Sequence, residues 1–262
     1  MTVVHHAIDG ITFRTESDFP IEEFELPRFA PFEAAPGHAD CVVEVHRTRG
    51  TTVPGGHSGT VTLNSGDCEL DIDFEARRLR VALTGDDLTH GSGHFRFGAF
   101  PYSVFLHEFG AVMLHSACVD FRGSGALLIA PDEGGKTTAA GLMDGGSVLS
   151  DDMTMAGRED DGFRAWGTPW TSFGPTPSST HVGGLFFLEK SDGFGLETIP
   201  FSEAFSRLWS DHGFMGEVMP SAHREVFFEL FCDLASAAPA WLLRFPRESI
   251  DVKAVRSVLE GP

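Results

Sequence analysis

The sequence of 262 residues has few cysteines, no long apolar run and no basic segment followed by an apolar one near its start. Its four cysteines are far apart and include no CxxC pair, so neither a zinc site nor a disulfide framework is expected. No run approaches the roughly 18 apolar residues of a membrane span, and Met1–Gly10 lacks the pattern of a signal peptide. We therefore expect a cytoplasmic protein without a membrane partner.

Basic residues are also scarce, because 19 lysines and arginines face 38 aspartates and glutamates, for a formal net charge of −19. Such a field repels nucleic-acid phosphates and anionic membrane surfaces, so no nucleic-acid partner is expected. It would suit a basic protein or peptide, although a solvated acidic surface is the simpler explanation. With 42% hydrophobic residues, the chain is long enough to bury a sizeable core.

Residues 1–105 are predicted to be mostly β. Apolar residues alternate with polar ones from Cys68 to Phe74 and again from Leu79 to Leu83, with a turn between the two runs. A period of two is typical of half-buried strands, so Cys68–Leu83 is predicted to be a hairpin.

After residue 105 the pattern changes to short strands followed by helices. The predicted strands are Val112–Leu114, Cys118–Phe121, Gly125–Ala130, Ser147–Ser150 and Gly183–Leu188. Apolar residues at helical spacing predict helices over Ser202–Asp211, Arg224–Ser236 and Asp251–Leu259. This order predicts one α/β domain over residues 1–262, with a β-rich N-terminal part (1–105) and a core (106–262) that ends in helices.

The segment Ala130–Thr138, APDEGGKTT, fits a relaxed Walker A pattern, in which Ala or Gly is followed by four residues and then by Gly-Lys-Thr. In such a loop, backbone N–H groups face phosphate, the lysine reaches the β- and γ-phosphates, and the hydroxyl ligates Mg²⁺. The apolar strand before the loop favours a nucleotide site over a plain Gly-rich turn. The predicted nucleotide-binding residues are Ala130, Glu133, Gly134, Gly135, Lys136, Thr137 and Thr138.

Two carboxylates lie inside this loop, at Asp132 and Glu133, directly after Pro131. Beside a triphosphate they are unexpected, because like charges repel at close range. They either point outward or weaken nucleotide binding.

Asp151 and Asp152 follow the predicted strand Ser147–Ser150. Beside a P-loop, one such carboxylate can hold Mg²⁺ and the other can accept a proton from an attacking hydroxyl. Adjacent side chains on a regular strand point to opposite faces, so the two need not share one role. By themselves, two aspartates would more simply begin a surface turn.

His115 lies in the stretch MLHSACV, ahead of the loop. It can contact phosphate or shift the pKa of the base, and the alternative is a histidine packed in the core. His107 and His115 are not expected to bind a metal, because their spacing matches no helix face and no third ligand is evident.

The stretch LHSACVDFRGSGALLIAPDEGGKTTAAGL, followed by SVLSDDMTM, resembles the P-loop core of the HPr kinase/phosphorylase family, which shares a fold with phosphoenolpyruvate carboxykinase. The likeness is good over residues 112–156 and does not extend to residues 1–90. It continues more loosely through Gly167–Trp170, Gly183–Glu189 and Glu203–Trp209, as in the smaller HPr-kinase-like proteins. The resemblance implies an α/β fold with a mixed central sheet and C-terminal helices.

By this resemblance, the functional positions are His115, Lys136, Thr137, Asp151 and Asp152. Lys136 and the loop backbone would bind phosphates, Thr137 and Asp152 would hold Mg²⁺, and the aspartate pair would supply the base. The loop departs from the family's Gly- and Ser-rich pattern, Thr138 replaces an acidic residue, and the signature loop of the bifunctional enzymes is missing. The resemblance therefore does not imply phosphorylase activity or HPr as the acceptor.

The expected function is an ATP-dependent phosphotransferase that uses Mg²⁺ and transfers the γ-phosphate to a Ser or Thr hydroxyl of a protein or peptide. Two alternatives stay open. One is a nucleotide-binding module without catalysis, which Asp132 and Glu133 favour, and the other is a kinase of a small hydroxylated metabolite. The sequence also leaves the oligomeric state open.

Overall fold

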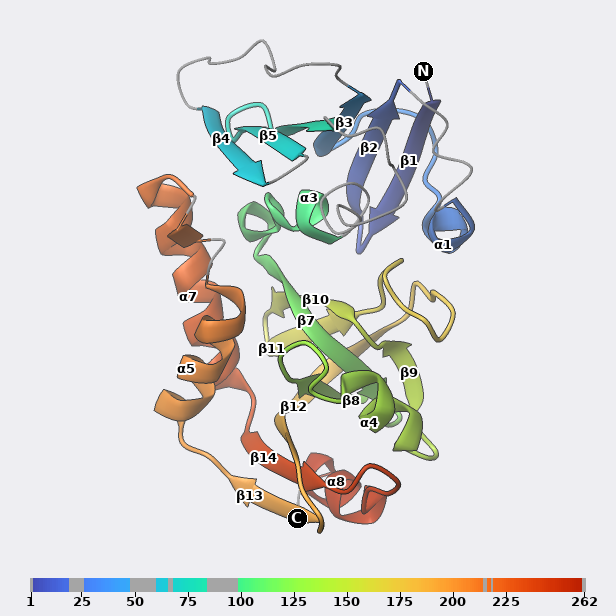
Figure 1. The fold of residues 1–262 in the computed structure, drawn as a ribbon, viewed down its shortest axis with the longest axis vertical. Coiled ribbons are helices and arrows are strands. Elements are labelled where there is room, and N and C mark those ends of the chain that lie inside the picture. The colour runs from blue at the N-terminus through green and yellow to red at the C-terminus, as the bar shows by residue number, and fades with distance from the viewer. Residues whose placement is uncertain are drawn as a thin grey trace. The chain divides into compact units, whose positions relative to one another are not determined.

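The computed structural model describes residues 2–18, 26–47, 60–65, 68–83, 99–213, 216–217 and 219–260. The chain is α/β with two mixed sheets, and it divides into two compact units, Met1–Phe109 and Gly110–Pro262 (Figure 1). Within the described ranges, no helix combines the length and the apolar character that a membrane crossing requires.

The N-terminal unit contains a six-stranded sheet in the order β1-β2-β3-β6-β5-β4. Strand β3 pairs in parallel with β2 and β6, and the other neighbours are antiparallel. The strands are β1 (Thr2–Ile8), β2 (Ile11–Ser17), β3 (Cys41–Arg47), β4 (Thr60–Ser65), β5 (Cys68–Asp73) and β6 (Arg78–Leu83). The short helices are α1 (Leu26–Phe29), η1 (Ala30–Phe32), α3 (Ala99–Ser103) and η2 (Leu106–Phe109).

The predicted hairpin Cys68–Leu83 is confirmed, because β5 and β6 pair antiparallel across a turn. Leu70 and Ile72 of β5 are buried, and so are Leu79 and Val81 of β6. The alternating apolar residues therefore form the face of the hairpin that packs into the core.

The C-terminal unit is built on an eight-stranded sheet in the order β11-β10-β7-β8-β12-β14-β13, with β9 paired to β7. Strand β12 pairs in parallel with β8 and β14, while the other pairings are antiparallel. The strands are β7 (Ala111–Asp120), β8 (Ser124–Ile129), β9 (Ser147–Ser150), β10 (Met153–Glu159), β11 (Gly162–Trp166), β12 (Ser179–Lys190), β13 (Gly195–Thr198) and β14 (Ala240–Phe245).

Helices cover this second sheet. They are α4 (Lys136–Leu142), α5 (Phe201–His212), α7 (Ser221–Ala237) and α8 (Val252–Leu259). Ala139 and Ala140 of α4 and Val255 of α8 share one core cluster with Leu128 of β8 and Phe186 of β12. That packing anchors α4, and hence the loop before it, against the middle of the sheet.

Helices α5 and α7 run beside one another (Figure 1). Their contact is aromatic, with ring centroids 5.2 Å apart for Phe205 and Phe228 and 5.9 Å apart for Trp209 and Phe231. The three predicted helices are confirmed in kind, since apolar spacing is a strong local signal for helices of this length.

The prediction of separate strands at Val112–Leu114 and Cys118–Phe121 is wrong. Val112–Leu114 and residues 118–120 lie in the single ten-residue strand β7, and Phe121 follows its end. Its first half pairs with β10, its second half pairs with β8 and β9, and the polar pair His115-Ser116 lies where the pairing changes. Polar residues in the middle of β7 therefore mark the point where its paired strands change. The local sequence pattern does not distinguish such a point from the end of a strand.

Four strands of this unit were not predicted, namely β10, β11, β13 and β14. The last of these, β14, interrupts a region that was predicted to be helical. Its residues Trp241, Leu242 and Leu243 are all buried, and a fully buried strand lacks the alternation that identifies a half-buried one.

Candidate active site

The loop of residues 130–135 joins β8 to α4 and has the backbone geometry of a tight strand-to-helix turn. Gly135 precedes the first residue of α4 with φ 99°, a conformation that favours glycine. At Gly134 a Cβ would lie 2.5 Å from Ala130 Cβ and 2.8 Å from the oxygen of Pro131. Glu133 takes a positive φ of 58° without being glycine, which is uncommon and typical of functional loops.

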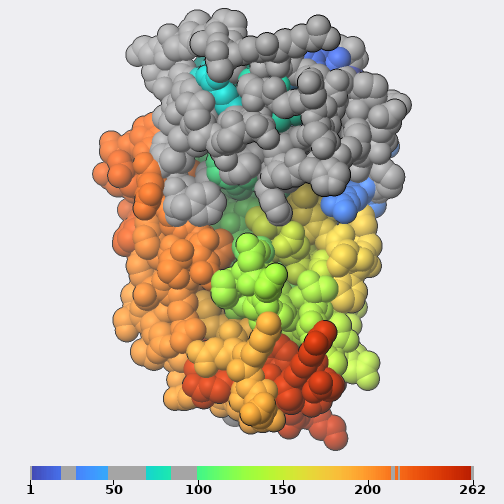
Figure 2. Space-filling model, viewed as in Figure 1, coloured from blue at the N-terminus to red at the C-terminus, as the bar shows by residue number. Residues whose placement is uncertain are grey.

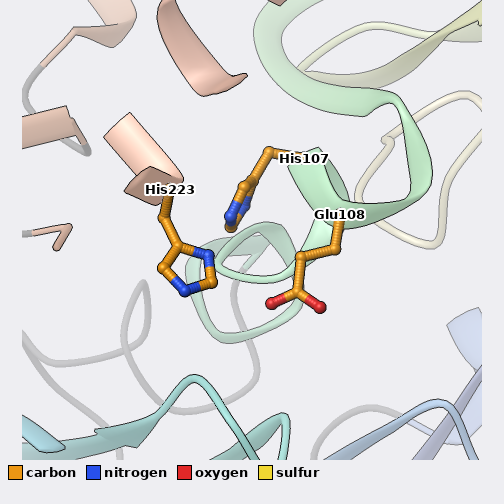
Figure 3. A group of neighbouring side chains, drawn as sticks. All are labelled: His107, Glu108 and His223. Carbon is orange, nitrogen blue, oxygen red and sulfur yellow. The ribbon is translucent and has the colours of Figure 1, made fainter. Parts of the chain in front are cut away.

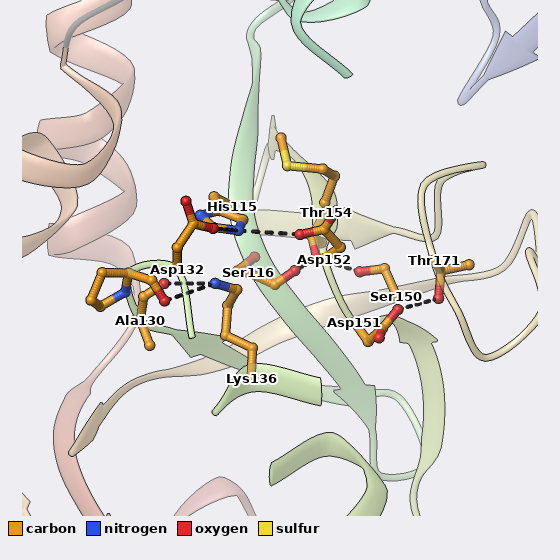
Figure 4. A network of polar contacts seen from close by, with 12 residues as sticks. His115, Ser116, Ala130, Asp132, Lys136, Ser150, Asp151, Asp152, Thr154 and Thr171 are labelled. Carbon is orange, nitrogen blue, oxygen red and sulfur yellow. Dashed lines mark hydrogen bonds and ion pairs between the residues drawn. The ribbon is translucent and has the colours of Figure 1, made fainter. Parts of the chain in front are cut away.

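Lys136 begins α4 and is only 6% exposed. Its Nζ donates to the carbonyl oxygens of Ala130 at 2.9 Å and Pro131 at 3.1 Å (Figure 4). Burial lowers the pKa of Lys136, and the nearby carboxylates of Asp152, Asp132, Asp211 and Asp151 oppose that shift. A cation with neutral hydrogen-bond partners thus lies in a strongly acidic surrounding.

Asp151 follows β9 and is 3% exposed. Its Oδ1 accepts from Thr171 Oγ1 at 2.8 Å and from the backbone N–H of Ser172 at 2.7 Å, and its Oδ2 accepts from Ser172 Oγ. Burial raises the pKa of Asp151, but hydrogen bonds from Ser172, Thr171 and Thr137 outweigh it and hold the pKa below its usual value. Asp151 is therefore an ionised carboxylate with its acceptor sites filled.

Asp152 has a different environment, with 53% of its side chain exposed. Its Oδ1 lies 3.1 Å from His115 Nε2, and Asp132 Oδ1 lies 3.4 Å from the same nitrogen (Figure 4). The imidazole of His115 thus stands between a carboxylate of the loop and one of the aspartate pair. Of the two aspartates, Asp152 is the one that an incoming molecule can reach.

The loop carboxylates are exposed to solvent, although Asp132 also contacts His115 of the network. Asp132 is 95% exposed at its side chain, and Glu133 is exposed as well. Atoms of this part of the chain, bright green near residue 130 on the colour bar, lie on the visible face in Figure 2. The backbone carbonyl of Glu133 accepts a hydrogen bond from Lys190 Nζ at 2.7 Å.

His212, the last residue of α5, was missed by sequence reasoning. Its Nε2 accepts from the backbone N–H of His115 at 2.8 Å, which places the proton on Nδ1, within 2.8 Å of Leu208 O. Burial lowers the pKa of His212 to about 4, so the ring is neutral near pH 7. It fixes the backbone of β7 where His115 faces the loop.

Lys190, Thr171 and Ser172 were missed as well. Thr171 and Ser172 lie in the segment after β11 and come to Asp151 only through the tertiary fold. Lys190 ends β12, which is paired with the P-loop strand β8. A lysine at the carboxyl end of a strand is a sequence signal for a ligand site, since ligand sites of α/β sheets collect at that edge. The sequence did not show, however, that this strand pairs with β8.

The structure brings together most of the predicted site residues. His115, Lys136, Thr137, Asp151 and Asp152 lie in one polar network with the loop. Ala130 is buried in the core and offers the site only its backbone carbonyl. Thr138 is exposed on α4, and among the described residues its side chain makes no hydrogen bond to this network.

His107 and the residues of this network belong to different units of the chain. With Glu108 it belongs to η2 of the N-terminal unit, where both side chains are drawn in Figure 3. The ring of His107 packs against Phe74, and Glu108 pairs with Arg77 at 2.5 Å. Since His115 belongs to the C-terminal unit, the pair His107 and His115 is not a site within either unit.

Comparison with models of known protein families and with curated protein sequences finds no match to this chain.

Proposed function

We propose that this chain is an ATP-dependent phosphotransferase that transfers the γ-phosphate to a Ser or Thr hydroxyl of a protein or peptide. The observation that carries the proposal is the gathering of Lys136, Thr137, Asp151 and Asp152 around one Gly-rich strand-to-helix loop. These are the residue types that phosphoryl transfer uses for phosphate, metal and nucleophile. We also propose that the core is HPr-kinase-like, on the resemblance of residues 112–156.

The donor set fits a nucleotide with Mg²⁺. Within the described ranges, the hydrogen-bond partners of Lys136 Nζ are neutral carbonyls, so a phosphate oxygen is a stronger acceptor for it than the present ones. The Thr137 hydroxyl donates a hydrogen bond to Asp151, which leaves its own lone pairs for a cation. When bound, Mg²⁺ supplies positive charge that offsets the carboxylates around Lys136 and neutralises charge on the phosphates.

The two aspartates are proposed to have different roles. Asp151 has filled acceptor sites, so it holds Thr137 in place and fixes the segment with Thr171 and Ser172. Asp152 is half-exposed and lies beside His115, so we propose that it accepts the proton of the acceptor hydroxyl and that His115 orients it. The metal contact expected of Asp152 is the competing role for the same carboxylate.

A second candidate is a nucleotide-binding module without catalysis. Four carboxylates act on Lys136, those of Asp152, Asp132, Asp211 and Asp151. Such a field weakens the attraction between the lysine and a triphosphate. In this case the nucleotide binds weakly and no phosphate is transferred.

The first test is calorimetric titration with ATP and Mg²⁺ of the native chain, the Lys136→Ala variant and a Lys253→Ala control. Lys253 is exposed on α8, and in the described part of the chain it makes no hydrogen bond or ion pair with the network. We expect micromolar binding that Lys136→Ala weakens by at least about a hundredfold, since a buried charge-assisted contact is lost. An unmeasurable affinity of the native chain at millimolar ATP would refute the kinase proposal.

Binding without turnover separates the two candidates. Purified chain with ATP, Mg²⁺ and Ser- or Thr-containing peptides, acidic and basic, is assayed for ADP release and for peptide phosphorylation. Peptide-dependent ADP formation supports the phosphotransferase. Measurable binding with no phosphorylated product from any peptide, nor from small hydroxylated metabolites, supports the module without catalysis.

A further inference from the structure

We propose that Lys190 is a second phosphate-binding residue of the loop, which acts with Lys136 on the anionic oxygens of a bound triphosphate. This inference rests on the proposed function and deepens it. It assigns to the site a cation that lies 54 positions further along the chain than Lys136 and that the Walker pattern does not contain.

Two lysines reach the loop from two different elements. Lys190, at the end of β12, donates from Nζ to Glu133 O at 2.7 Å, while Lys136, at the start of α4, donates to the oxygens of Ala130 and Pro131. A Cβ built on Gly135 would lie 3.9 Å from Lys190 Cε. The Lys190 side chain therefore passes along the glycine that precedes α4, next to the residues expected to surround phosphate.

Two lysines at one loop are unusual in a chain with so few lysines. The whole chain contains three lysines, Lys136, Lys190 and Lys253, against 16 arginines. Described arginines such as Arg158, Arg207 and Arg244 pair with carboxylates. Among the described residues, neither loop-bound lysine has a carboxylate within ion-pair distance. Their positive charges are therefore not neutralised by direct contact in a protein that carries a large negative charge.

The loop itself supplies a reason for a second cation. Asp132 and Glu133 put two negative charges beside the place where a triphosphate would lie, and one lysine leaves that excess uncompensated. Lys190 reaches the backbone of one of these residues, Glu133. A neutral carbonyl is a weaker partner for an ammonium group than a phosphate oxygen, so the bond can be exchanged on binding at a net gain.

A purely structural role for Lys190 is the alternative to exclude, because its bond also holds the strained backbone of Glu133. The two roles need different chemistry. Glutamine can donate a hydrogen bond to the Glu133 carbonyl but carries no charge, whereas methionine does neither. A structural role is therefore preserved in Lys190→Gln, while phosphate binding is lost in both Lys190→Gln and Lys190→Met.

The experiment measures dissociation constants of the full chain for ATP with Mg²⁺ and for inorganic triphosphate with Mg²⁺. The proteins are the native chain, Lys190→Gln, Lys190→Met and the control Lys253→Gln. We expect both Lys190 variants to weaken both ligands by about tenfold or more, as loss of a charge-assisted contact predicts, with the control unchanged. A parallel loss for inorganic triphosphate assigns the contact to phosphate and not to the base or sugar.

Affinity of Lys190→Gln equal to that of the native chain overturns the inference, whether or not Lys190→Met is impaired. It leaves the proposed function standing, provided that the native chain binds ATP and Lys136→Ala does not. Failure of the native chain to bind either ligand overturns both.

A second readout needs no variant. Because the chain has only three lysines, amine acylation followed by mass spectrometry reports on each of them separately. ATP with Mg²⁺ should protect Lys136 and Lys190 and leave Lys253 as reactive as before. Equal acylation of Lys190 with and without the nucleotide, in a chain whose Lys136 is protected, counts against the inference.

Discussion

At the scale of single residues, two adjacent aspartates show that the surroundings of a side chain, and not its residue type, decide its role in the site. Asp151 is buried and accepts hydrogen bonds from Thr171, Ser172 and Thr137, whereas Asp152 is half-exposed and contacts His115. Adjacent side chains leave the backbone in different directions. One carboxylate therefore stabilises the architecture of the site while its neighbour stays accessible for chemistry.

This difference predicts opposite phenotypes for the two conservative variants. Asp152→Asn should keep the native unfolding free energy and ATP affinity but lower turnover by about a hundredfold or more, the usual range for a lost general base. Asp151→Asn should lower the unfolding free energy by about 2 kcal/mol, because buried donors lose a charged acceptor. Urea denaturation and steady-state assays measure both. Recovery of Asp152→Asn turnover at high Mg²⁺ would assign Asp152 to the metal instead.

At the scale of elements, the segment between β11 and β12 is held to the site by its hydrogen bonds to Asp151. Thr171→Val removes one of these bonds and leaves the shape of the side chain nearly unchanged. We expect a loss of about 1–3 kcal/mol in unfolding free energy and a higher pKa for Asp151. Chemical denaturation at several pH values checks both. Ser178→Ala, at an exposed position of the same segment, is the control and should change neither quantity.

Strand β7 shows the same dependence on neighbours at this scale. Its first half pairs with β10 and its second half with β8, and His115 lies at the change of partner. The backbone N–H of His115 bonds instead to His212, at the end of α5. A side chain of helix α5 thus accepts the hydrogen bond of a backbone N–H of β7 beside the site. Buried backbone N–H groups need such a partner.

At the scale of the whole molecule, acid sensitivity follows from buried neutral histidines in both units. His6 packs against Phe13, Phe29 and Tyr102, and neither of its ring nitrogens has a hydrogen-bond partner among the described residues. Burial lowers the pKa of His6 to about 3. Below about pH 6.5 the unfolded chain takes up a proton that folded His6 does not bind until near pH 3, so stability falls as the pH falls across that window.

The His6→Phe variant tests this linkage. Between pH 7 and pH 5, protonation of His6 in the unfolded state costs the native chain about 2 kcal/mol of stability. The variant should lose about that much less over the same interval, as measured by urea denaturation followed by circular dichroism. An equal loss in the two proteins would show that His6 is not kept neutral by the fold. His212, lowered to about 4, should still contribute its own acid sensitivity in the variant.

Part of the fold and most of the candidate site were predictable because their signals are local. Each of these signals lies within a short segment of the sequence: the helical spacing of apolar residues in Arg224–Ser236, the alternation in Cys68–Leu83, and the APDEGGKTT loop. Strand β14 and the continuity of β7 were not predictable, since a buried strand and a mid-strand change of partner leave no periodic mark. The mixed α/β class was predicted and is confirmed.

The sequence by itself determined the loop: the glycines that allow its turn, the lysine that follows them, and the two aspartates after the next strand. Tertiary structure decided which aspartate is buried, which histidine supports β7, and that Lys190 reaches Glu133. The reason is physical. Backbone conformation depends on neighbouring residues, whereas burial and cross-strand contacts depend on which strands pair, and the parallel pairing of β8 with β12 joins segments that are distant in the chain.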